Sequence, residues 1–174
     1  MDFEYLHPII EATARIFRHL FQLEIRPLEY FYTHQERTQN PILCEVTGMI
    51  HFSNGVKGSL YLYLPQNLAR KLIQKMLSLA QSDSLDKRIL ADGVGELTNL
   101  ICGNSKEGLS KMCRKIELSL PHVIFGKSYK IMRPRDTVGL ATLLDSEDGK
   151  FIIELNIKTN PNKEEKKLFS SLAH

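Results

Sequence analysis

The chain has few of the features that mark membrane, nucleic-acid-binding or disulfide-rich proteins. No stretch approaches the roughly 18 consecutive apolar residues of a membrane-spanning helix, so the sequence predicts no such helix. The 23 Lys and Arg residues and the 20 Asp and Glu residues leave a formal net charge of +3, which is too weak to favour a nucleic-acid partner. The three cysteines include no C-x-x-C pair, and this pattern favours free thiols in a reducing cytoplasm over a disulfide framework.

Several common site motifs are also missing. The six histidines are scattered without metal-ligand spacing, so we expect no metal site and no cofactor of the protein's own. Gly93-Val-Gly95 matches only half of a G-x-G-x-x-G motif and falls inside an expected helix, which excludes dinucleotide binding there. The acidic first residues, followed by Pro8, differ from the basic start of a secretory signal. We therefore expect a cytoplasmic protein.

Length and composition predict one globular domain. Of the 174 residues, 43% are hydrophobic and 25% are charged, which is the ordinary balance of a folded soluble domain. Residues 159–174 are mostly polar and indicate a tail or a short terminal helix. We place the single domain at residues 1–158.

Apolar residues recur at helical spacing in three segments. The first helix is expected over residues 8–21, because Pro8 suits the first helical position. A second helix follows Pro65, with apolar side chains on one face through Leu79, and a third runs from about Leu85 to Lys115. The aromatic-rich segment 28–34 is expected to be extended.

Two β-hairpins are expected from turn dipeptides between apolar runs. Asn54-Gly55 lies between two alternating runs and predicts a hairpin over about residues 43–64 with a two-residue loop. Asp148-Gly149 lies in the same way between residues 140–144 and 151–157. The order α-β-β-β-α-α-β-β-β predicts an α+β fold, with two or three long helices on one face of a largely antiparallel sheet.

The third helix carries a polar patch away from its apolar stripe. Successive residues lie about 100° apart around a helix, so the stripe toward the core contains Leu90, Val94, Leu97 and Ile101. Asp92, Glu96 and Asn99 fall together on another side, with Glu96 and Asn99 as i, i+3 neighbours. Any surface helix shows acids and amides toward water, so spacing alone leaves both a solvated face and a functional site open.

Four of the ten glycines lie in this helix, although each costs about 0.8–1 kcal/mol relative to Ala in a helix interior. Gly93 and Gly108 face the expected core and could admit close packing. Gly95 and Gly103 flank the polar patch. We interpret bare backbone beside the patch as room for a large partner to approach closely.

The residues around the patch resemble a known family. Asp92, Glu96 and Asn99 form a D-x-x-x-E-x-x-N pattern, which is similar to the helix motif of the CheC/CheX/FliY chemotaxis phosphatases. Residues 7–17 and 47–59 are similar to the first helix and the hairpin of the CheX branch, and the resemblance covers about residues 1–157. The single E-x-x-N copy also favours CheX over CheC. Pro121 is the candidate for the proline of the family pattern.

The resemblance implies a phosphatase that accelerates hydrolysis of the aspartyl phosphate of a CheY-type response regulator. Asn99 would orient the attacking water, and Glu96 would pair with the receiver's active-site lysine, so these two are the expected catalytic residues. Asp92, Gly95 and Gly103 are the expected partner-binding residues. A Mg²⁺ ion is expected in the partner receiver rather than in this chain.

Other functions remain compatible with the same residues. The scaffold could be a non-catalytic docking module that binds or sequesters a receiver or a flagellar component, or a structural subunit of a larger assembly. CheX relatives are understood to join their sheets across a two-fold axis, so the resemblance also implies a homodimer. No nucleic-acid or membrane partner is expected.

Overall fold

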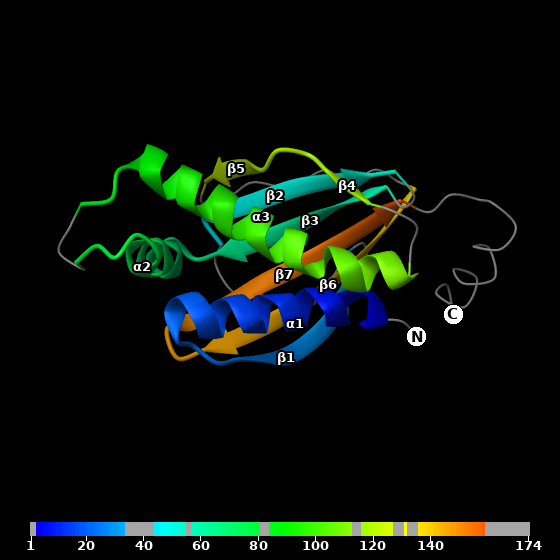
Figure 1. Cartoon of the computed structure of the whole chain (residues 1–174), viewed down its shortest axis with the longest axis horizontal. Coiled ribbons are helices and arrows are strands. Elements are labelled where there is room, and N and C mark those ends of the chain that lie inside the picture. Colours follow the sequence, from blue (N-terminus) through cyan, green and yellow to red (C-terminus); the bar gives the residue numbers. More distant parts are fainter. Residues whose placement is uncertain are drawn as a thin grey trace, which may run out of the picture.

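The computed structural model describes residues 3–33, 44–54, 57–80, 84–112, 116–126, 131 and 136–158. The expected C-terminal tail, residues 159–174, lies outside the described residues, as do Gly55 and Cys113. Three α-helices lie on one face of a single curved sheet, with α3 running diagonally across it (Figure 1). No helix in the described part of the chain is long and apolar enough to cross a membrane.

The helices begin and end close to the expected positions. A 3₁₀ turn, η1 (Phe3–Leu6), leads into α1 (His7–Ile16), which continues as a π-helical turn, η2 (Phe17–Phe21), and ends where Gln22 takes a φ of 57°. The second helix is α2 (Gln66–Met76), with Pro65 at its N-cap, and the third is α3 (Lys87–Met112). Leu79 lies beyond the end of α2, so its expected place on the apolar helix face is wrong.

The strands form one antiparallel sheet with the order β1-β6-β7-β3-β2-β4, and β5 also pairs with β2. Their bounds are β1 Ile25–Tyr32, β2 Val46–Ser53, β3 Gly58–Leu64, β4 Glu117–Leu118, β5 His122–Phe125, β6 Thr137–Ser146 and β7 Gly149–Lys158. The α+β class and the block of helices on one sheet face are therefore confirmed.

Both hairpins exist, but one turn differs from the prediction. Phe52 lies opposite Gly58 across β2 and β3, so the connection is longer than the two-residue Asn54-Gly55 loop that we predicted. Across β6 and β7, Ser146 lies opposite Gly149, which leaves residues 147 and 148 as a two-residue turn. Gly149 takes a φ of +142°, a backbone conformation that side chains with a Cβ rarely adopt.

Small residues let α3 approach its three neighbours closely. Gly48 of β2 faces Thr98, and a Cβ at this position would overlap the threonine hydroxyl. A Cβ on Gly93 would lie 2.6 Å from the Cγ2 atom of Ile73 on α2, and one on Gly108 would lie 2.5 Å from the Cβ atom of Pro8 on α1. These contacts confirm the expected packing role of Gly93 and Gly108. They also fix the rotation of α3, and thereby the side of this helix that faces water.

Candidate functional site

The predicted polar patch lies on the outward side of α3. Leu97 and Ile101 are fully buried in the core between the helices and the sheet. Asp92, Glu96 and Gly103 are exposed, and Asn99 is half-buried. The structure therefore brings the predicted carboxylates and the amide together on one face, because the glycine and threonine contacts described above hold the opposite sides of α3 against its neighbours.

The polar side chains of this face are unpaired among the described residues. In the described parts of the chain, no hydrogen bond or ion pair involves the side chain of Asp92, Glu96 or Asn99. Asp92 and Glu96 are i, i+4 neighbours, and like charges at that spacing destabilise a helix by about 0.2–0.5 kcal/mol. The helix thus keeps two carboxylates and an amide at its surface that bond to none of the described residues.

Gly95 does not lie where the sequence analysis expected it. It is buried, and a Cβ at this position would lie 3.6 Å from the Cγ atom of Pro121 and 3.7 Å from the Cγ2 atom of Val123. The chain's own β4–β5 segment covers this side of α3, so Gly95 is not available to a partner. Gly103 has no atom within 4 Å of such a Cβ position, and its surface is open.

Pro121 sits where an edge strand is interrupted. Both β4 and β5 pair with β2, and residues 119–121 separate them. Ser119 holds this break in place: its N–H donates to the His51 carbonyl (2.9 Å), and its hydroxyl accepts from the His51 N–H (3.0 Å). Leu120 is consequently pushed outward and is 82% exposed. Sequence reasoning missed this exposed leucine, although a proline inside a strand pattern is a signal for an edge break.

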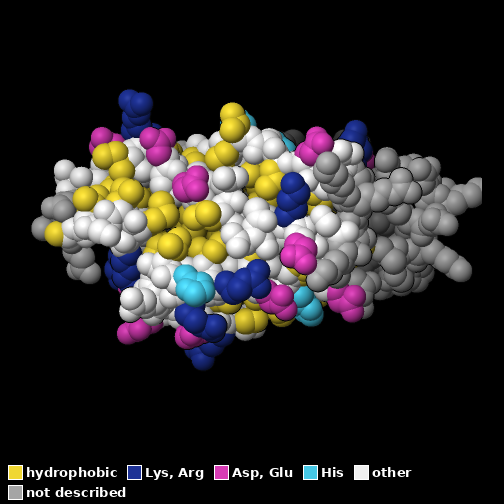
Figure 2. Space-filling model, in the orientation of Figure 1, with side chains coloured by type: hydrophobic (Ala, Val, Ile, Leu, Met, Phe, Trp, Pro, Cys, Tyr) yellow, Lys and Arg dark blue, Asp and Glu magenta, His cyan; other side chains and the backbone are white. Residues whose placement is uncertain are grey.

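Apolar side chains adjoin the acidic end of the patch. Ile89 precedes Asp92 by one helical turn and is 40% exposed, and Leu77 and Leu79 in the α2–α3 connection are 44% and 38% exposed. Figure 2 shows hydrophobic side chains gathered over this end of the molecule, where α2 and α3 meet. A surface that combines exposed apolar groups with unpaired charges is typical of protein–protein contact sites.

The two described cysteines are unsuited to nucleophilic chemistry. Burial raises the pKa of the Cys44 thiol to about 12, with a further increase from the charge of Glu45. Burial likewise raises the pKa of the Cys102 thiol to about 12, although Lys106 acts in the opposite direction. Both thiols therefore stay protonated near neutral pH, and only the thiolate is a good nucleophile. This confirms the expectation of an inert thiol at Cys102.

The chemistry that α3 offers is positioning. An amide group both donates and accepts hydrogen bonds without titrating, so Asn99 can orient a water molecule. A free carboxylate such as Glu96 can pair with a cationic side chain of a partner. In the ranges that the structure describes, no three His, Cys, Asp or Glu side chains gather as a possible metal site.

Several solved structures with the same fold are described as chemotaxis or CheC-like proteins. CheX from Desulfovibrio desulfuricans is 22% identical, with a TM-score of 0.75, over 89% of this chain and 99% of that one. A CheC-like superfamily protein from Shewanella sp. PV-4 is 24% identical, with a TM-score of 0.76, over 91% of this chain and 99% of that one. A chain in the CheX–CheY–BeF₃–Mg²⁺ complex from Borrelia burgdorferi is 22% identical, with a TM-score of 0.67, over 88% of this chain and 96% of that one.

The sequence itself matches a family model. No curated protein matches the chain. The model for the chemotaxis phosphatase CheX matches residues 46–156, which include β2 and β3, the whole of α3 with its polar patch, and most of the β6–β7 hairpin. The chain therefore belongs to the CheX family of chemotaxis phosphatases.

Proposed function

We propose that this protein is a phosphatase that accelerates loss of the aspartyl phosphate from a CheY-type response regulator. The observation that carries this proposal is the unpartnered Glu96–Asn99 pair on the outward face of α3 in a CheX family member. The Borrelia burgdorferi complex, in which a CheX protein is bound to CheY with BeF₃ and Mg²⁺, supports a receiver as the partner.

Asn99 is the residue that we assign to the reaction. Hydrolysis of an acyl phosphate needs a water molecule in line with the phosphorus, and phosphoryl transfer depends mainly on positioning and electrostatics. The Asn99 amide would accept a hydrogen bond from the attacking water and hold it in that line. Its half-buried position supports this role, because a partly enclosed side chain has fewer orientations to lose on docking.

Glu96 is assigned to docking rather than to proton transfer. Its exposed carboxylate forms no ion pair with the residues that the structure describes, and it would pair with the active-site lysine of the receiver. Asp92, one turn away, adds negative potential on the same face, and the open surface at Gly103 admits the partner. A Mg²⁺ ion would be held by the receiver, and we assign none to this chain.

The test is phosphate release from a phosphorylated receiver in the presence of Mg²⁺. We expect catalytic amounts of the protein to increase the rate of release, with each molecule acting on many receivers. A slower or unchanged rate, together with stoichiometric binding, would contradict the phosphatase proposal. That result would identify the protein as a docking module that sequesters its partner.

A further inference from the structure

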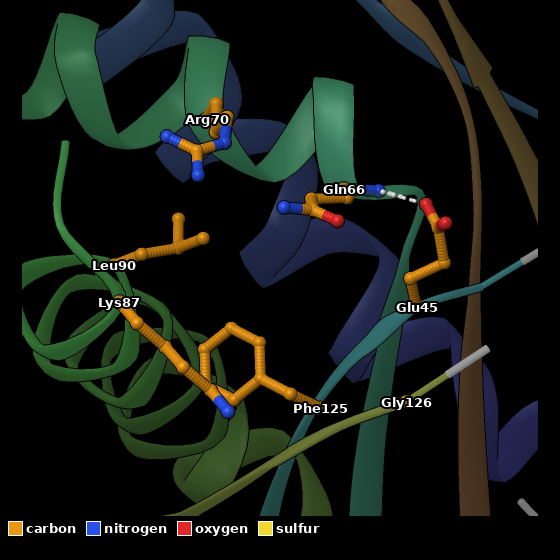
Figure 3. Close-up of a pocket in the computed structure, with 7 residues that line it drawn as sticks. All are labelled: Glu45, Gln66, Arg70, Lys87, Leu90, Phe125 and Gly126. Carbon is orange, nitrogen blue, oxygen red and sulfur yellow. Dashed lines mark hydrogen bonds between the residues drawn. The ribbon is translucent and has the colours of Figure 1, made fainter. Parts of the chain in front are cut away.

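A second candidate site lies between α2, α3 and the end of β5. It is a cavity of about 310 Å³, lined by Glu45, Gln66, Arg70, Lys87, Leu90, Phe125 and Gly126. Figure 3 shows the Arg70 and Gln66 side chains extending from α2, with Leu90, Lys87 and Phe125 across the space from them. The volume is at the lower end of the roughly 300–1,000 Å³ of small-molecule sites, so it suits a compact ligand.

Neither cation of this pocket has an anionic partner among the described residues. Arg70 donates one Nη1 hydrogen bond to the Leu85 carbonyl (2.8 Å), and its other guanidinium nitrogens make no hydrogen bond in the described parts of the chain. The Lys87 ammonium lies over the Phe125 ring, 5.0 Å from its centroid. Among the residues that the structure describes, no carboxylate pairs with either cation.

The one acid of the pocket is already engaged. The Glu45 carboxylate accepts a hydrogen bond from the Gln66 backbone N–H at 3.1 Å, and so caps the start of α2 (Figure 3). A carboxylate in this position is stabilised by the helix dipole. The capping bond keeps this carboxylate at the start of α2, and the pocket lining holds two cations and one carboxylate, so its formal charge is positive.

The remaining walls offer apolar and amide groups. Leu90 is buried, Phe125 is half-buried, and the Gln66 side-chain amide can both donate and accept hydrogen bonds. A guanidinium group matches the geometry of a phosphate, and an ammonium adds a second charge for a dianion. A flat, apolar group with polar edges would complement the aromatic ring and the amide.

We propose that this pocket binds a phosphate monoester that carries a planar ring, for which a nucleoside monophosphate is the representative ligand. Arg70 and Lys87 pair with the phosphate, and Leu90, Phe125 and Gln66 contact the ring. Such a ligand would bridge α2, α3 and β5 at a place separate from the Glu96–Asn99 face. The inference does not depend on phosphatase activity, because the readout is binding alone.

Calorimetric titration of the full chain with AMP, ribose 5-phosphate and inorganic phosphate tests the proposal. We expect saturable binding of AMP and weaker binding of the two probes that lack the planar ring. Lys87→Met should weaken AMP binding by about tenfold or more, which is the loss expected for a charge-assisted contact. Arg70→Met should do the same, but it also removes the bond to the Leu85 carbonyl, so Lys87→Met decides the test if Arg70→Met does not fold.

Matched variants separate the pocket from general charge effects. Arg88→Met and Lys150→Met each remove one exposed cation outside the pocket and should leave AMP affinity unchanged. Phe125→Leu should lower AMP affinity toward that of ribose 5-phosphate and leave ribose 5-phosphate binding unchanged. Absence of saturable AMP binding, equal binding of AMP and inorganic phosphate, or AMP affinity unaffected by Lys87→Met would each overturn the proposal.

Discussion

At the scale of single residues, the Glu96 and Asn99 side chains have different expected roles although they lie one turn apart. The carboxylate can form an ion pair in the docked complex, whereas the amide can orient a water molecule. Neither side chain forms a hydrogen bond or ion pair within the described ranges, so we expect substitutions at both positions to leave the protein folded. Substitutions at the two positions should therefore affect different measurements.

Glu96→Ala should weaken binding to the receiver by about tenfold or more, since it removes a charged partner from a docked interface. The rate at saturating receiver should fall less than the affinity does. Affinity can be measured by titration with a receiver loaded with BeF₃ and Mg²⁺. Glu11→Ala is the matched control, because Glu11 is an exposed glutamate on α1, and it should bind as the unchanged protein does. Equal affinities for the two variants would contradict the docking role.

The sequence located the carboxylates and the amide correctly but misplaced one flanking residue. Helical spacing suffices for Asp92, Glu96 and Asn99, because the core stripe that orients them is regular. It fails for Gly95, because Pro121 and Val123 cover that side of α3 and come from a segment far along the chain. The Arg70–Lys87 pocket could not be predicted for a similar reason, since α2 and α3 form it together with Glu45 and the end of β5, which lie farther away in the sequence.

At the scale of elements, the glycines of α3 divide into packing positions and open positions. Gly93→Ala should lower the free energy of unfolding by about 1–3 kcal/mol, because the added methyl group would overlap Ile73. Gly103→Ala has open space around it and should raise this free energy by up to about 1 kcal/mol. Urea denaturation of both variants measures the difference, and equal shifts would contradict this division.

Gly103→Leu should impair docking without impairing folding. Leucine is a better helix former than glycine, but its side chain would stand one turn from Asn99, where the receiver is proposed to approach. We expect weaker binding to the receiver with no loss in the free energy of unfolding, while Gly103→Ala should bind nearly as well as the unchanged protein. If Gly103→Leu binds with unchanged affinity, the open surface at this glycine is not needed by the partner.

Elements were easier to predict from sequence than their connections. Turn dipeptides between apolar runs identified both hairpins, although buried and exposed positions alternate only in the second half of β2 and residues 151–157 of β7 are buried throughout. The β2–β3 turn was predicted too short, since its length depends on the strand register that β4 and β5 help to fix on the other side of β2. The break at residues 119–121 lies between β4 and β5, which both pair with β2.

At the scale of the whole molecule, the sheet has two edges at which another chain could pair. β1 forms one edge, and β4 with β5 forms the other. Leu28 and Tyr30 on β1 are 44% and 37% exposed, and an uncovered edge strand is a template for pairing with another chain. We therefore expect a homodimer with a mass about twice the 20.0 kDa of one chain. Light scattering at micromolar concentration measures this mass, and a monomer across the accessible range would contradict the expectation.

The Asn99 amide is proposed to accelerate hydrolysis by positioning water, and one pair of variants separates this role from a structural one. Asn99→Ala should lower the maximal rate of receiver dephosphorylation by about 10²-fold or more, as the loss of other positioned catalytic groups does, with little change in affinity. Asn104→Ala removes an exposed amide from the same helix and should keep the full rate. The measurement is phosphate release over a range of receiver concentrations. A near-normal maximal rate for Asn99→Ala would show that this amide does not position the attacking water.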